Sequence, residues 1–222
     1  MTAVNEAVLP RYGFGDELAS SVIHGVGIVL SAIGLAVLVI HTAMAGTASD
    51  VLASAVYGIS LILLYTASTL YHTVRAESAR RVLRTLDHIA IFLLIAGTYT
   101  PFTLIALRGT WGWSLFGIVW SLALLGSALE LGVLKRYRRF AVLLYIAMGW
   151  VGIIAFRPLL AHLQTGGMVL LLGGGAAYTL GVPFYLWRRL PYHHSVWHFF
   201  VLAGSVLQFL AVLLYVVPNA RM

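Results

Sequence analysis

The sequence predicts an all-α, polytopic membrane protein built as a bundle of seven transmembrane helices. Hydrophobic residues make up 61% of the 222-residue chain and charged residues only 9%, too few to cover the surface of a soluble protein. The chain also divides into seven apolar runs without Asp, Glu, Lys or Arg, each close to or above the about 20 residues that a helix needs to cross a bilayer. The runs cover residues 21–48, 51–74, 88–107, 110–129, 140–156, 158–187 and 195–219.

The connections between these runs are short, which leaves no room for a soluble domain. We therefore expect one seven-helix membrane domain over residues 1–222, with a short cytoplasmic N-terminal segment at residues 1–20.

Basic residues set the expected orientation. All 14 lysines and arginines except Arg108, Arg157 and Arg221 fall before the first run or after the second, fourth and sixth runs. Because the excess of Lys and Arg stays in the cytoplasm, the N-terminus is predicted inside and the C-terminus outside. Membrane lipids with anionic headgroups, and not nucleic acid, are the expected partners of this charge.

Four polar residues are brought to the cytoplasmic leaflet by this topology. They are His72 at the end of the second run, Asp87 before the third, and His194 and His198 at the start of the seventh. The two histidines of the seventh run are four residues apart, so both lie on one helix face and suit a single zinc ion. They could equally be interfacial residues that hydrogen-bond lipid headgroups. A third imidazole from His72 favours the metal site, because three nitrogen ligands leave the fourth zinc position open, as at catalytic zinc.

Two further residues are candidates for catalysis beside this metal. Asp87 could hold and deprotonate the metal's water, although an acidic residue at a helix start also complements the helix dipole. Ser68 lies four residues before His72, on its face, and could hydrogen-bond a substrate carbonyl; back-bonding to its own helix is the alternative. The chain has no cysteine, so any ligands are nitrogen or oxygen atoms. Glu17, Ser21 and His24 are expected at the same depth, without an assigned role.

Four stretches together resemble the progestin and adipoQ receptor superfamily, and within it the bacterial hemolysin III branch. They are residues 17–27 (ELASSVIHGVG), 68–72 (STLYH), 86–102 (LDHIAIFLLIAGTYTPF) and 194–204 (HSVWHFFVLAG). The resemblance spans the chain and its motifs occur in the family's order. It implies a multi-pass protein of the bacterial cell membrane, with seven helices and a zinc ion near the cytoplasmic side.

The resemblance also implies a role for individual residues. The zinc ligands would be His72, His194 and His198, with Asp87 reaching the metal through water and Ser68 as the family's serine.

Three functions remain open on these grounds. The first is a zinc-dependent hydrolase of the ceramidase type, which cleaves a lipid amide or ester bound within the bundle at the cytoplasmic leaflet. The second is a non-enzymatic receptor or regulator of membrane lipid or energetic state, in which zinc is structural. The third is a cytolytic pore, for which the runs offer no evident polar lining. The sequence predicts neither a substrate nor an oligomeric state.

Overall fold

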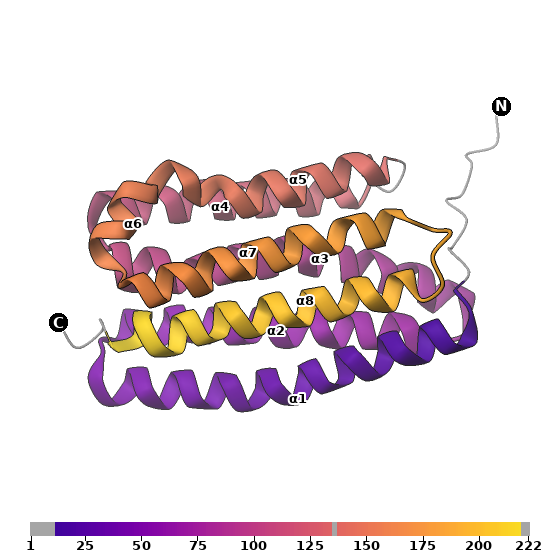
Figure 1. Ribbon diagram of the computed structural model, residues 1–222, viewed down its shortest axis with the longest axis horizontal. Helices are drawn as coiled ribbons and strands as arrows, with labels where there is room; N and C mark the ends of the chain where they lie inside the picture. Colours follow the sequence, from indigo (N-terminus) through magenta and orange to yellow (C-terminus); the bar gives the residue numbers. More distant parts are fainter. Residues whose placement is uncertain (1–11, 135–136, 219–222) are drawn as a thin grey trace.

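The computed structural model describes residues 12–134 and 137–218, and in this part of the chain every regular element is helical (Figure 1). Seven helical spans in the described residues are long and apolar enough to cross a membrane. The predicted all-α, seven-helix membrane fold is therefore confirmed. The orientation of its ends relative to the cytoplasm remains a prediction.

The spans lie side by side, and each runs along the long axis of the bundle (Figure 1). Short segments of other helix types extend three of them. The elements are α1 (Phe14–Ala45), α2 (Ala48–Thr73), α3 (Glu77–Pro101) with the π-helix η1 (Phe102–Leu107), α4 (Gly109–Glu130), α5 (Arg138–Trp150) with the 3-10 helix η2 (Val151–Ala155) and α6 (Phe156–His162), α7 (Thr165–Leu186), and α8 (His193–Ala211) with the π-helix η3 (Val212–Val216).

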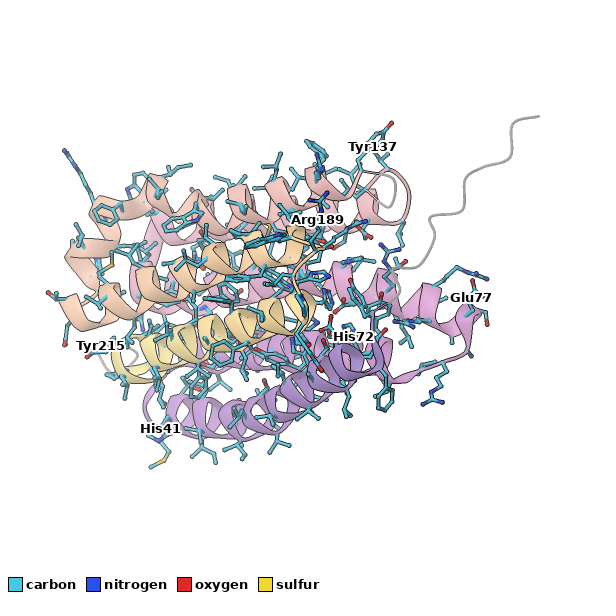
Figure 2. All side chains as sticks on the ribbon, turned by 45° about the vertical axis from the view of Figure 1, so that its right-hand side comes forward. His41, His72, Glu77, Tyr137, Arg189 and Tyr215 are labelled. Atoms are coloured by element: carbon cyan, nitrogen blue, oxygen red, sulfur yellow. The ribbon has the colours of Figure 1, made fainter. Side chains whose placement is uncertain are left out.

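The end of the bundle at which α1 and α8 begin is called the histidine end below. Figure 2 shows His72 at this end together with Glu77 and Arg189, whereas His41 and Tyr215 lie at the opposite end. The histidine end is the one that the charge distribution predicts to be cytoplasmic. Arg11, Lys135, Arg136 and Arg221, which belong to that distribution, lie outside the described residues.

The boundary between the fifth and sixth spans differs from the prediction. Residues 158–187 were expected to form the sixth span, but Pro158 lies inside α6 and the sixth span begins at Thr165. Pro158 is the third residue of α6, where a backbone N–H has no helical acceptor to lose, so a proline does not end the span there. Arg157 is tolerated in the same helix because it is exposed near the end opposite the histidines.

The third span begins earlier than its apolar run. That run begins at residue 88, but α3 begins at Glu77. The added turns carry an exposed ion pair between Arg81 and Glu77, with nitrogen and oxygen 3.0 Å apart. Such a pair, four residues apart, supports a helix in water or among headgroups. Apolar runs mark the part of a helix inside the hydrocarbon and miss turns that project from it.

Packing joins the helices in a ring. α1 packs along α2 and α8, α2 along α3, α3 along α4, and α7 along α8, while α5 makes fewer contacts with α4 and α7 and closes the ring. The outer surface of α1 carries apolar side chains at helical spacing, including Leu18, Val22, Val29 and Ile33, each more than half exposed. A continuous apolar face of this kind is the surface that lipid tails cover in a membrane protein.

Candidate metal centre

Three buried histidines from two helices converge at the histidine end. His72 lies at the end of α2, and His194 and His198 lie one turn apart at the start of α8. Each of the three offers a ring nitrogen, and these nitrogens all lie within 4.8 Å of one another. Residues more than 120 positions apart in the chain are thus brought together.

The spacing of the nitrogen atoms fits a tetrahedral metal ion. Nε2 of His72 lies 3.3 Å from Nε2 of His194 and 3.1 Å from Nε2 of His198. Two ligands about 2.0–2.1 Å from a tetrahedral zinc ion are about 3.3–3.4 Å apart. Burying a polar atom without a partner costs free energy, so three buried nitrogens that face one point are stabilised by a shared partner there. This donor set could therefore bind a metal ion.

Glu17 on α1 holds the first of these ligands. Its Oε2 lies 2.5 Å from Nδ1 of His72, and because a carboxylate only accepts, His72 donates its proton there. The lone pair of His72 is consequently on Nε2, the atom that faces the other two histidines. A carboxylate behind a histidine ligand is a regular feature of metal sites, since it fixes the ring and raises its basicity. Arg80 on α3 contacts the second oxygen of Glu17.

Aromatic rings enclose the cluster on two sides. Tyr12, just before α1, stacks on His194 with ring centroids 4.2 Å apart and an angle of 19° between the planes. Burial raises the pKa of Tyr12 well above its usual range, so this phenol stays neutral. His24 on α1 lies 3.9 Å from His198 between ring centroids, edge to face, and also meets Tyr65. Neither ring nitrogen of His24 has a hydrogen-bond partner among the described residues.

A second contact fixes the start of α8 against α1. The Ser195 backbone N–H donates to Asp16 Oδ1 at 2.9 Å, and its hydroxyl donates to the same carboxylate. Ser20 lies 3.2 Å from the Ser195 hydroxyl. Because Ser195 follows His194 directly, these bonds set the position of the two ligands on α8.

Asp87 and Ser68 lie beside the histidines. Asp87 is buried on α3, and its carboxyl group lies near the imidazoles of His88 and His72 and the hydroxyl of Ser68. The Ser68 hydroxyl does not reach hydrogen-bond geometry with Asp87 and has no other partner in residues 12–134 and 137–218. A buried hydroxyl left unpaired in this way can bond a ligand or a water molecule.

Other polar residues near this depth take part in different contacts. His88 turns away from the cluster toward α4, where its Nδ1 lies 3.4 Å from Oε1 of the fully buried Glu130. The Ser21 hydroxyl donates to the Glu17 carbonyl of its own helix and does not reach the cluster.

A cavity of about 1040 Å³ meets the cluster on one side. His194, His198 and Asp87 line it at the histidine end. It continues between α3, α4, α5, α7 and α8 to Leu107 and Leu159 near the opposite end. Its volume lies at or above the upper range of small-molecule sites. The cluster is thus within reach of a molecule with a long apolar part.

Some of these residues were missed or left without a role at the sequence level. Glu17 was placed at the right depth, but its contact with His72 joins residues 55 positions apart. The Asp16 to Ser195 contact joins residues 179 positions apart, and Tyr12 precedes the first apolar run. The sequence signal for the contacts of Glu17 and Asp16 is the presence of acidic residues next to a membrane helix. This signal does not predict which neighbouring helix their side chains face.

Comparison with known proteins places these motifs in one family. The Haemolysin-III related family matches residues 12–209. Hemolysin-3 of Bacillus cereus is 47% identical over 92% of this chain and 94% of its own length. The Hemolysin-3 homolog of Bacillus subtilis (strain 168) is 44% identical over 91% of this chain and 95% of its own. The human Monocyte to macrophage differentiation factor is 27% identical over 72% of this chain and 68% of its own. No solved structure matches the chain.

Proposed function

Because the chain belongs to the haemolysin III-related family and is a multi-pass protein of the cell membrane, we propose that it is a zinc-dependent hydrolase of membrane lipids. The bond cleaved would be an amide or an ester of a lipid at the cytoplasmic leaflet. The observation that carries this proposal is the convergence of three histidine nitrogens beside a large cavity that His194, His198 and Asp87 line.

The donor set favours zinc. His72, His194 and His198 supply three imidazole nitrogens, and zinc commonly takes three protein ligands at catalytic sites. With no cysteine in the chain, sites for iron–sulfur clusters and thiolate-bound copper are excluded. Zinc in such a site would polarise a carbonyl oxygen and make water acidic enough to attack near neutral pH.

The residues around the cluster would have separate tasks. Asp87 accepts the proton of the attacking water and passes it to the leaving nitrogen or oxygen, so that the elements of water add across the broken bond. Ser68 donates a hydrogen bond to the carbonyl oxygen as negative charge develops on it. Glu17 keeps His72 oriented and its Nε2 free to bind. The cavity holds the acyl chain among mostly apolar side chains.

The two alternatives have less support. A purely structural zinc needs no access for a ligand, whereas the cavity reaches His194 and His198. A cytolytic pore needs a polar path through the bundle, whereas the cavity is lined by Leu107, Leu115 and Leu159 toward the end opposite the histidines.

The proposal is tested by measuring fatty-acid release from a panel of N-acyl and O-acyl lipids in detergent. Zinc-loaded protein is compared with Asp87→Asn, and zinc content is measured in the same samples. We expect Asp87→Asn to keep its zinc and to lose about 10²-fold or more of the turnover rate, the usual contribution of a general base. Ser68→Ala should lose less, because one neutral hydrogen bond is removed.

Glu77→Gln is the matched control, since Glu77 is an exposed carboxylate on the same helix as Asp87. Its turnover should equal that of the wild type. Zinc-loaded wild type that releases no more fatty acid than chelator-treated protein, for every lipid in the panel, would contradict the hydrolase and favour the structural role of zinc.

A further inference from the structure

Arginine side chains surround the cavity where it meets the histidine end. They come from three places in the chain, namely α3, the start of α5 and the connection between α7 and α8. The four residues are Arg84, Arg139, Arg188 and Arg189. Arg139, Arg188 and Arg189 are exposed, so the cavity reaches the surface here. Figure 2 shows Arg189 at the same end as His72.

Asp87, which interacts electrostatically with Arg84, offsets only part of the charge of this arginine group. None of the four forms an ion pair with a carboxylate among residues 12–134 and 137–218, whereas Arg80, Arg81 and Arg108 each have one. Within the described part of the chain, Asp87 is the one carboxylate that lines the cavity. The cavity entrance therefore carries a clear excess of positive charge.

The rest of the cavity is long and mostly apolar. It follows α3 and η1 from Asp87 to Leu107. Twenty helical residues at 1.5 Å each correspond to roughly 30 Å, about the thickness of the hydrocarbon core of a bilayer. Ile95, Phe102 and Leu171 are among the side chains that line it. A site with charge at one end and an apolar channel behind it matches a molecule with one anionic group and a long hydrocarbon chain.

We propose that the arginine group binds the anionic headgroup of a lipid whose acyl chain occupies the cavity. Guanidinium groups pair with phosphate oxygens through two parallel hydrogen bonds, so a phospholipid headgroup is the best match. The lipid selected at the metal centre is then an anionic phospholipid and not a zwitterionic or neutral lipid. The last step, from bound lipid to substrate, rests on the proposed function; the binding does not.

Topology alone does not explain this placement. Arginines are expected throughout the predicted cytoplasmic face. Arg75 and Arg81 lie on that face too, but they are exposed near the start of α3 and do not line the cavity. Arg75 has no ion pair among the described residues, Arg81 pairs with Glu77, and neither lies at the cavity, so the two together are the control for general surface charge.

The test is lipid binding to purified, zinc-loaded protein, measured by native mass spectrometry. The probes are dioleoylphosphatidylglycerol, dioleoylphosphatidylcholine and inorganic phosphate. Wild type should bind phosphatidylglycerol about tenfold more tightly than phosphatidylcholine, and Arg188→Gln/Arg189→Gln should weaken phosphatidylglycerol binding about tenfold, given the attraction of each basic residue for anionic headgroups. Arg75→Gln/Arg81→Gln should change it less than about twofold, as for exposed charges.

Three results would overturn the proposal. Equal weakening by both double variants would mean that only the general surface charge matters. Equal affinity of the wild type for the two lipids would remove the headgroup preference. Inorganic phosphate that binds as tightly as phosphatidylglycerol, and displaces it fully, would mean that the arginines hold free phosphate and that the cavity adds nothing.

Failure here and failure of the hydrolase are distinguishable. His194→Ala should lose its metal and still bind phosphatidylglycerol, because the arginines lie on other elements. A wild type that binds the anionic lipid selectively but never cleaves lipid would refute the hydrolase alone. The arginine site alone would be refuted by a different pair of results. The wild type would cleave anionic and zwitterionic lipids at the same rate, and Arg188→Gln/Arg189→Gln would cleave them as fast as the wild type.

Discussion

The two sides of this bundle differ in what fills the space between their helices. On the side of α1, α2 and α8, side chains from different helices bond directly, as with Glu17 to His72 and Tyr65 to Ser205, the latter at 2.7 Å. On the side of α3, α4, α5 and α7, the helices enclose a cavity of about 1040 Å³. The histidine cluster lies where the two sides meet.

This difference separates two requirements of the site. A metal ion needs ligands held in fixed positions, and the packed side supplies them through bonds from α1 to His72 and to Ser195. A lipid needs room, and the cavity side supplies it. One bundle therefore combines a rigid wall that carries the ligands with an adjacent space that a flexible molecule can enter.

The largest effect expected on the packed side follows from Glu17→Gln. An amide keeps the size of the carboxylate but is a weaker acceptor for His72 Nδ1–H and no longer carries the charge that pairs with Arg80. Metal affinity should fall about 10- to 100-fold, as on loss of similar carboxylates behind histidine ligands. Competition with a chelator of known zinc affinity measures it.

Glu77→Gln is again the control, because it removes one carboxylate from the histidine end without touching the cluster. An unchanged zinc affinity in Glu17→Gln would show that the contact with His72 does not hold the ligand, and the packed side would lose the role assigned to it.

Alanine substitution of one glycine on each side should have a smaller effect, and it compares how tightly the two sides are packed. A Cβ atom on Gly27 of α1 would lie 2.5 Å from the ring of Tyr65, whereas a Cβ on Gly175 of α7, which lines the cavity, would meet nothing closer than Trp150 at 3.7 Å. Gly27→Ala should lower the free energy of unfolding by about 1–2 kcal/mol through overpacking. Gly175→Ala should leave it unchanged or raise it by up to about 1 kcal/mol, since alanine favours the helix.

Unfolding in mixed micelles, followed by circular dichroism, gives both values. Gly25→Ala is the control on α1, because a Cβ there meets nothing within 4 Å among the described residues. Equal destabilisation by Gly27→Ala and Gly175→Ala would mean that the two sides are packed alike and would remove the contrast.

The sequence predicted the fold well because the bilayer imposes it. Length and polarity of an apolar run are enough to find a membrane helix, and all seven were found. They are not enough to find its ends: α3 extends to Glu77 outside the hydrocarbon, and Pro158, expected to start a span, sits within the first turn of α6. Local bonding decides such boundaries.

The candidate site was predicted to the extent that depth in the membrane determines it. Charge asymmetry placed His72, His194 and Asp87 at one end, and the structure brings them together. Depth says nothing about rotation of a helix about its axis, so the contacts of Glu17 and Tyr12 with the cluster were not foreseen. A lipid bound within the bundle was expected, but the size and lining of the cavity were not, because they depend on how side chains of several helices pack.

The central claim is that three histidines bind one metal ion at the junction of the two sides. The most direct test is the metal content of detergent-purified protein, measured by mass spectrometry for wild type, His72→Ala and His194→Ala/His198→Ala, with His41→Ala from the opposite end as control. We predict near one zinc per chain in the wild type and in the control, and its loss in the other two variants. A wild type that binds no metal after zinc supplementation, or variants that retain it, would contradict the account.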